Sequence, residues 1–182
     1  MNSKHAILFF FVLISIGTHG QEVFINGTQG NRRLTWEDFA GQVDKRSAFA
    51  AFTWWDMNYR YSSVQFNGDT AILMGLMIKL EFNSNRSWIK KGKESDNLLI
   101  HEQGHFDIGL LCLLDLMRTF DSTIFFRSDF ATKPGLLFRT SLEKYQALSL
   151  KYDAETDHSK NQRRQIKWDL FLNNELQRSV RK

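Results

Sequence analysis

Two histidines and a glutamate form the pattern HExxH at residues 101–105 of this chain. An α-helix advances about 3.6 residues per turn, so side chains four positions apart project from one face. His101 and His105 can therefore direct imidazole nitrogens at one metal ion. Glu102 lies beside them on the helix surface, where its carboxylate can take a proton from water without binding the metal. This combination predicts a zinc ion that activates water for hydrolysis.

The residues around the motif indicate that it lies inside the domain. An unsatisfied polar group buried there costs about 1–3 kcal/mol, and an unpaired charge costs more. A divalent cation would satisfy both imidazoles and the carboxylate together, whereas a chance HExxH would leave them without partners. The apolar residues that surround the helix nearly all round are Leu98, Leu99, Ile100, Phe106, Ile108, Leu110, Leu111, Leu113 and Leu114.

A catalytic zinc ion needs a third protein ligand and keeps its fourth position for water. His158 is the only histidine beyond the motif, and it ends a dense cluster of possible ligands at residues 152–158. We predict His158 as the third ligand. The alternatives are Asp153, Glu155 and Asp157, either as ligands or as groups that hold a ligand from behind.

Three other residues near these motifs carry reactive side chains. Tyr145 or Tyr152 could hydrogen-bond an oxyanion, although a tyrosine on an amphipathic helix is more often a core residue. Cys112 is the only cysteine and lies among leucines, so we expect a small core residue and no internal disulfide.

Residues 1–20 have the features of a secretory signal peptide. Lys4 and the free amine give a positive start, residues 6–16 are an apolar stretch too short to span a membrane, and small residues surround Gly20. We predict cleavage near Gly20, export to the periplasm or the extracellular space, and one domain over residues 21–182. The alternatives are an uncleaved membrane anchor and a buried N-terminal helix.

The net charge of +4 and the isoelectric point near 9.2 are modest. A basic final segment could associate peripherally with anionic envelope surfaces, although such a run is more often a solvated helix face. The sequence has no zinc-finger pattern, glycine-rich phosphate loop or RNA-binding aromatic signature, so we expect no nucleic-acid partner. Much of the excess charge lies near the C-terminus, at Arg163, Arg164, Lys167, Arg178, Arg181 and Lys182.

The elements that position these residues change in character along the chain. Period-two alternation predicts a strand over residues 48–61. Strands at 64–66 and 70–82 flank Asn67-Gly68, a strong hairpin signal because both residues tolerate positive φ. The aromatic residues of the strand expected over 48–61 could form a carbohydrate or peptide platform, but core packing is the default for them.

Helices are expected in the second half. Ser95 or Asp96 should cap the HExxH helix, which runs to about Phe120. Lys133-Pro134-Gly135 predicts a turn, and a second helix is expected from near Thr140 to 157. A last helix over 162–180 is expected to pack through Ile166, Trp168, Leu170, Phe171 and Leu176.

The chain resembles the exported bacterial proteins of the domain of unknown function 922 family, described as predicted secreted zinc-dependent proteases of the zincin type. The specific likeness is HEQGHFDI at 101–108 and the YDxxTxH stretch at 152–158. The family pattern continues with glycine where this chain has Ser159. The resemblance implies a bacterial envelope or secreted metallohydrolase and supports His158 as a ligand. Weaker likeness lies at residues 34–39 and 50–61 and at Ser87, Trp88, Gln165 and Trp168.

These observations predict a single α+β, zincin-like domain in which a small sheet packs on the HExxH helix and further helices follow. Zn²⁺ would be held by His101, His105 and His158, with Glu102 as the general base that cleaves a peptide or protein substrate. By analogy with zincins, residues 70–82 would be an edge strand that pairs with the substrate.

Two other functions fit the same residues. One is a non-catalytic, zinc-stabilised envelope-binding module, whose metal would recruit a fourth protein ligand such as Asp153 alongside His158. The other is a metalloamidase that acts on cell-wall peptides, which shares the chemistry and differs only in substrate.

Overall fold

The computed structural model describes residues 20–30 and 33–180, with the side chain of Val180 left out. The predicted signal peptide therefore lies outside the described residues, apart from Gly20, which begins the first strand.

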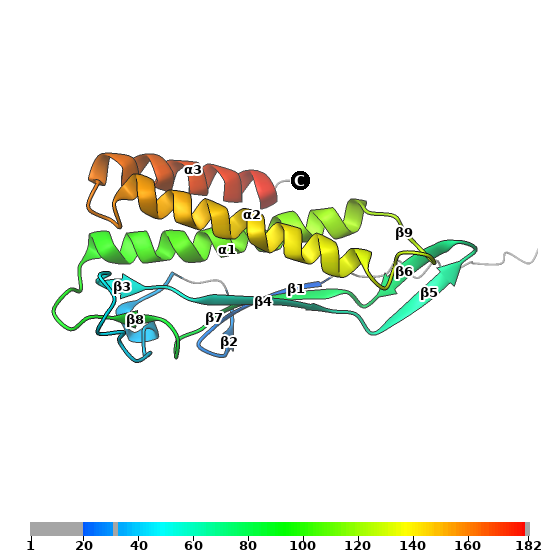
Figure 1. The fold of residues 1–182 in the computed structure, drawn as a ribbon, viewed down its shortest axis with the longest axis horizontal. Coiled ribbons are helices and arrows are strands. Elements are labelled where there is room, and N and C mark those ends of the chain that lie inside the picture. The colour runs from blue at the N-terminus through cyan, green and yellow to red at the C-terminus, as the bar shows by residue number, and fades with distance from the viewer. Residues whose placement is uncertain (1–19, 31–32, 181–182) are drawn as a thin grey trace, which may run out of the picture.

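The helix that carries the HExxH motif lies between a layer of strands and two further helices (Figure 1). The α+β class predicted from the sequence is confirmed. Among the described residues, no helix is both long and apolar enough to cross a membrane. The three helices are α1 (Asp96–Ser122), α2 (Lys133–Thr156) and α3 (Gln162–Val180).

The strands form three small sheets. The central one has the order β2-β1-β7-β4, in which β1 pairs with β7 in parallel and the other pairs are antiparallel. Its strands are β1 (Gly20–Ile25), β2 (Thr28–Gln29), β4 (Trp55–Arg60) and β7 (Met77–Phe82). At one end of the molecule β3 (Ala51–Phe52) pairs with β8 (Trp88–Ile89). At the other end lie β5 (Ser63–Asn67), β6 (Thr70–Met74) and β9 (Phe125–Phe126).

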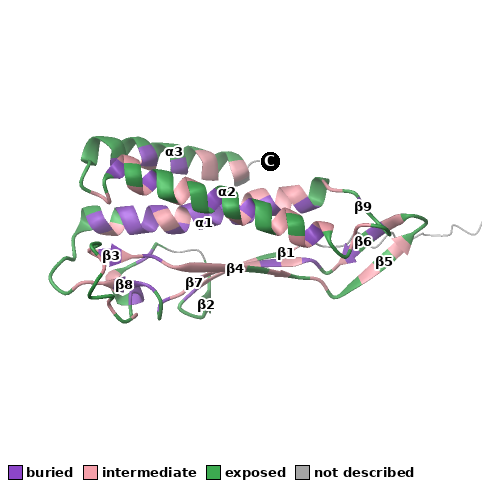
Figure 2. Cartoon of the chain, in the orientation of Figure 1, coloured by how far each residue is buried: buried purple, intermediate pink, exposed green. Residues whose placement is uncertain are grey.

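Much of the surface of helix α1 is buried (Figure 2). The strands cover it on one side and α2 and α3 on the other, which explains why its sequence is apolar nearly all round. One core cluster joins it to the central sheet through residues such as Leu80 and Phe106, and a second joins it to α2 and α3 through Ile108 and Leu172. The N-cap is Ser95, as predicted, and its hydroxyl accepts a hydrogen bond from the backbone of Leu98 at 3.3 Å.

Three predictions about the strands need correction. The strand expected over 48–61 is divided into β3 and β4, and the one expected over 70–82 is divided into β6 and β7 near Gly75, whose φ is 62°. Strand β7 is not an edge, because β1 and β4 flank it. Among the described strands, β4 is an edge strand of the central sheet, and β3, which pairs only with β8, has one unpaired edge. The hairpin at Asn67-Gly68 is confirmed.

The helices also differ from the sequence prediction in two places. Helix α2 begins at Lys133 and not near Thr140, because Pro134 occupies the first turn, where its missing N–H costs no hydrogen bond. A short helix, η1 (Trp36–Asp38), has Thr35 as its N-cap, and the Thr35 N–H donates to Asp38 Oδ2 at 2.8 Å. The buried face of α3 is made by Gln165, Trp168 and Leu172, spaced three and four apart, whereas Ile166, Leu170 and Phe171 are exposed.

Candidate metal centre

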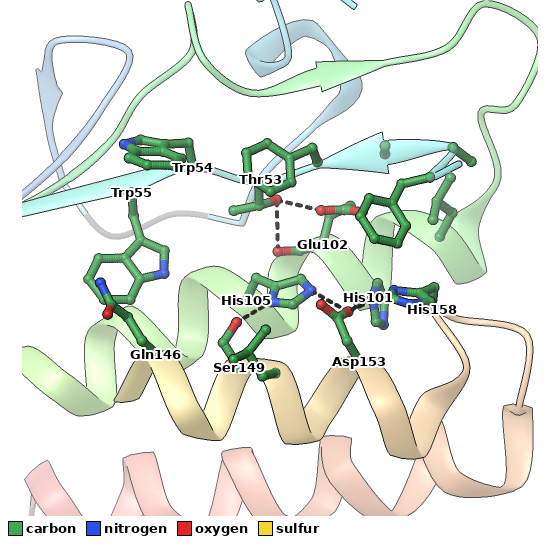
Figure 3. A pocket seen from close by; sticks show the side chains of 16 residues that line it. Thr53, Trp54, Trp55, His101, Glu102, His105, Gln146, Ser149, Asp153 and His158 are labelled. Atoms are coloured by element: carbon green, nitrogen blue, oxygen red, sulfur yellow. Dashed lines mark hydrogen bonds and ion pairs between the residues drawn. The ribbon is translucent and has the colours of Figure 1, made fainter. Parts of the chain in front are cut away.

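Helix α1 presents His101, Glu102 and His105 toward one cavity (Figure 3). His101 and Glu102 are buried, with 2% and 3% of their surface exposed. The last turn of α2 faces this part of α1 and supplies Asp153, and His158 follows directly after the helix ends. The structure therefore brings together the HExxH motif and the C-terminal ligand cluster, which are about fifty positions apart in the sequence.

Three imidazoles converge on one carboxylate oxygen. Asp153 Oδ1 lies 3.1 Å from His101 Nε2, 3.0 Å from His105 Nε2 and 3.2 Å from His158 Nδ1. Zinc bonds to nitrogen and oxygen measure about 2.0–2.2 Å, so neighbouring ligand atoms of a tetrahedral site lie about 3.3 Å apart. The donor atoms of His101, Asp153 and His158 all lie within 4.8 Å of one another and could hold a metal ion.

Two of the imidazoles are fixed by a contact at their second nitrogen. His101 Nδ1 lies 3.1 Å from Gln165 Oε1, and His105 Nδ1 lies 2.7 Å from the hydroxyl of Ser149. Such contacts set the ring orientation and the tautomer, so that each Nε2 is directed at the donor cluster. Tyr152 adds a stacked ring against His101, with 4.6 Å between the ring centroids.

The electrostatics of the cluster favour an ionised carboxylate. Burial alone would raise the pKa of Asp153, but hydrogen bonds from His101 and His105 outweigh it and hold that pKa well below its usual range. Burial likewise would lower the pKa of His105, yet the hydrogen bond that it donates to Asp153 and the charges of Glu102 and Asp153 raise that pKa. The charge of Asp153 thus suits a cation placed among these donors.

Glu102 is held apart from this donor cluster. The Thr53 hydroxyl, on the segment between β3 and β4, donates to Glu102 Oε2 at 2.7 Å. Figure 3 shows the Glu102 carboxylate directed toward this strand segment, while His101 and His105 are directed toward Asp153. Glu102 therefore lines the same cavity as the imidazoles but contributes no atom to the cluster.

His158 is held less firmly than the other donors. It lies in a run of three residues with left-handed backbone, since φ is 47° at Asp157, 49° at His158 and 74° at Ser159. Such a conformation costs a residue other than glycine roughly 1–2 kcal/mol. The side chain is 37% exposed, and its ring packs on Phe49 with 4.4 Å between centroids. Ser159 thus adopts the conformation that glycine would adopt most easily.

A cavity of about 430 Å³ opens onto the donor cluster. It lies between α1, α2 and the strand segment that carries Thr53, and Trp55 and Gln146 come together at one of its ends (Figure 3). Ligand sites of small molecules and side chains have volumes of this order. The cavity gives the candidate metal centre access to a bound molecule.

Several alternatives from the sequence are placed elsewhere. Glu155 accepts a hydrogen bond from the Trp168 indole at 3.0 Å, and Asp157 is exposed. The Tyr152 hydroxyl donates to the His101 carbonyl at 3.1 Å and accepts from Gln165 at 2.6 Å, so it is not free to meet an oxyanion. Tyr145 belongs to the core between the helices.

Sequence reasoning missed Thr53 and Ser149, which hold Glu102 and His105. Thr53 and Ser149 lie on different parts of the chain, and no local sequence pattern distinguishes them from other threonines and serines. Gln165 was noted only as part of the family resemblance, and Trp168 there and as a packing residue of the last helix; Gln165 contacts His101 and Trp168 contacts Glu155. Compared with known proteins, the chain matches no family model, no curated protein and no solved structure.

Proposed function

We propose that the protein is a zinc-dependent metallopeptidase with a zincin-like site. The observation that carries this proposal is the cavity in which four metal-binding side chains converge beside a separately held glutamate. A site whose metal only stabilised the fold would have no use for a buried carboxylate directed away from the donors. The resemblance of residues 101–108 and 152–158 to predicted secreted zinc-dependent proteases implies the same activity.

His101, His105 and Asp153 are the firmest ligands in this proposal. Both imidazoles are oriented by contacts behind them, and Asp153 Oδ1 lies within 3.2 Å of every other donor. His158 completes a set of four, which would close a tetrahedral site. Nitrogen and oxygen donors in this number suit zinc, although related divalent metals accept the same groups.

The open position required for hydrolysis would come from His158. Its ring is the most exposed of the three imidazoles, at 37% against 3% for His101 and 12% for His105. A ring that turns away from Asp153 toward solvent leaves the other three ligands in place. The resting protein would then have four protein ligands, and the reacting protein three with a water molecule.

Glu102 is the general base in this scheme. A bound zinc ion lowers the pKa of water and polarises a carbonyl group. Glu102 takes a proton from the attacking water and later delivers it to the leaving amine. The hydrogen bond from Thr53 to Oε2 holds the carboxylate in the cavity that the donor cluster also lines.

The substrate would bind along the edge formed by β3 and β4. Strand β3 has one partner, β8, and β4 is the last strand of its sheet, so both leave their other edge unpaired within the described part of the chain. Ala51 and Thr53 on this edge line the cavity. An extended peptide could add there as a further strand and pass in front of Glu102.

The second candidate function is a zinc-stabilised binding module without catalysis. The observation in its favour is that Asp153 and His158 both reach the donor cluster, which would fill a tetrahedral site. A metalloamidase that cleaves cell-wall peptides remains a variant of the first proposal with a different substrate. The export predicted from residues 1–20 would bring either kind of peptide to the site.

The test is Glu102→Gln, which keeps the size of the side chain and removes its basicity. We expect a loss of at least about 100-fold in the rate of peptide hydrolysis, the scale of general base catalysis. Zinc content and melting temperature should stay unchanged. The measurement follows new amino termini released from denatured protein and from cell-wall peptides. Glu143→Gln, an exposed change on α2 outside the cavity, is the matched control.

Each alternative has its own result in this experiment. Equal cleavage by wild type and Glu102→Gln would mean that another group is the base. Zinc-loaded wild type that releases no amino termini from either substrate would favour the binding module.

A further inference from the structure

Two large apolar side chains are exposed where they line the cavity of the candidate metal centre. Phe49, before β3, is 41% exposed, and Leu150, on α2, is 71% exposed. Phe49 belongs to the chain segment that leads into β3, Leu150 belongs to α2, and both line the cavity. Exposed apolar side chains gathered on a concave surface mark a place where an apolar group binds.

The deeper lining has the same character. Phe52, Trp54, Trp55 and Leu98 contribute to it, and the Trp55 ring also packs against α1, where a β-carbon at Gly109 would lie 3.1 Å from it. Trp55 is therefore held in place by its packing on α1, and a bound side chain would contact a preformed surface. A volume of about 430 Å³ has room for a large side chain with part of its backbone.

The charges of the lining restrict which peptides fit. Among the described residues that line the cavity there is no lysine or arginine. An acidic side chain that entered the apolar part of the lining, away from the metal donors, would lose its water and gain no lysine or arginine partner. The acidic groups of the lining are Glu102 and Asp153, and both belong to the proposed catalytic and metal-binding machinery.

We infer that the cavity selects a large apolar side chain of an extended peptide, which makes the protein a peptidase for bulky apolar sites. The inference rests on the proposed hydrolysis and names its substrate class. Water is added across one peptide bond: its hydroxyl forms the new carboxyl group, its proton passes to the amine, and no oxidant or reductant is needed. Phe49 and Leu150 are the specificity-determining residues.

The experiment uses zinc-loaded protein and a set of blocked peptides that differ at one position, which holds Phe, Leu, Ala or Glu. We expect the Phe and Leu peptides to be cleaved with kcat/KM at least about tenfold above the Ala and Glu peptides, the scale of discrimination by an apolar pocket.

Leu150→Glu places a charge at the cavity and should lower kcat/KM for the Phe peptide at least about tenfold, mainly through KM. Because Leu150 is largely exposed, folding should be preserved, and an unchanged melting temperature checks this. Leu136→Glu is the matched control, since Leu136 is also exposed on α2 but does not line the cavity. It should cleave the Phe peptide as wild type does.

A binding measurement separates the substrate class from the catalytic proposal. The zinc-loaded Glu102→Gln protein is titrated with the same peptides, which it should bind without cleaving. Preference for Phe and Leu, lost in the double variant with Leu150→Glu, supports the inference even if wild type hydrolyses nothing. Equal cleavage or binding of the Glu and Phe peptides, or no binding of any peptide, overturns it.

Discussion

At the scale of single residues, the candidate centre depends on one oxygen atom. Asp153 Oδ1 contacts all three imidazoles, whereas His158 reaches only this oxygen within the cluster. Removing the carboxylate would leave buried imidazoles close together with no anion between them. Removing the His158 ring would leave His101, His105 and Asp153 as they are. The sequence favoured His158 over Asp153 as the third ligand, but in the structure more contacts depend on Asp153.

We predict that Asp153→Ala lowers zinc affinity by more than 100-fold and that His158→Ala lowers it by about 10–100-fold, the range seen when supporting groups are lost. Competition with a chromophoric chelator measures both. In cobalt-substituted protein, His158→Ala should change the visible spectrum, because water replaces a nitrogen ligand. Equal losses in the two variants would identify His158 as a fixed ligand and favour the non-catalytic module.

At the scale of elements, the packing of α1 on α2 depends on Gly104 inside the HExxH motif. A β-carbon there would lie 2.3 Å from the Tyr152 hydroxyl oxygen. That hydroxyl is held by the His101 carbonyl and by Gln165, so it cannot move aside without breaking hydrogen bonds. Glycine is normally unfavourable within a helix, and its presence here is explained by this close approach.

Gly104→Ala is therefore expected to lower the free energy of unfolding by about 1–3 kcal/mol, although alanine is the better helix former. Gly109→Ala should cost less, since its β-carbon would lie 3.1 Å from Trp55 and 3.2 Å from Leu80. Gly135→Ala is the control, because 3.6 Å to the Tyr59 hydroxyl is ordinary contact. Urea denaturation of the metal-free variants measures all three. A Gly104→Ala protein as stable as wild type would mean that α2 shifts freely.

Local patterns explain which elements could be predicted from the sequence. The cap at Ser95 and the helix beginning at Gln162 follow from neighbouring residues, and HExxH fixes its own geometry through the helical repeat. The parallel pairing of β1 with β7 joins segments 57 residues apart, and no local signal specifies it. The contact of Thr53 with Glu102 is equally non-local, as is the choice between Asp153 and His158.

At the scale of the whole molecule, the candidate centre ties the three helices together at one end. His101 and His105 belong to α1, Asp153 to α2, and Gln165 of α3 contacts His101 from behind. The sheet of β5, β6 and β9 lies at the opposite end (Figure 1). A metal ion bound by these donors would stabilise the site end directly, and the far sheet only through the shared core along α1.

We therefore predict that the protein binds one zinc ion per chain and that this ion adds to its stability. A ligand that binds only the folded state contributes about 2.7 kcal/mol when its free concentration is 100 times its Kd. A chelator should lower the melting temperature, and zinc should restore it. The double variant His101→Ala/His105→Ala should bind no stoichiometric zinc and show no such shift.

Hydrogen exchange tests where in the molecule the metal acts. On metal removal, amides near Asp153 and Gln165 should lose protection before those of β5 and β6, because the donors lie at the other end of the molecule. Uniform loss along the chain would mean that the metal supports the core as a whole, and stoichiometric zinc in the double variant would place its site elsewhere.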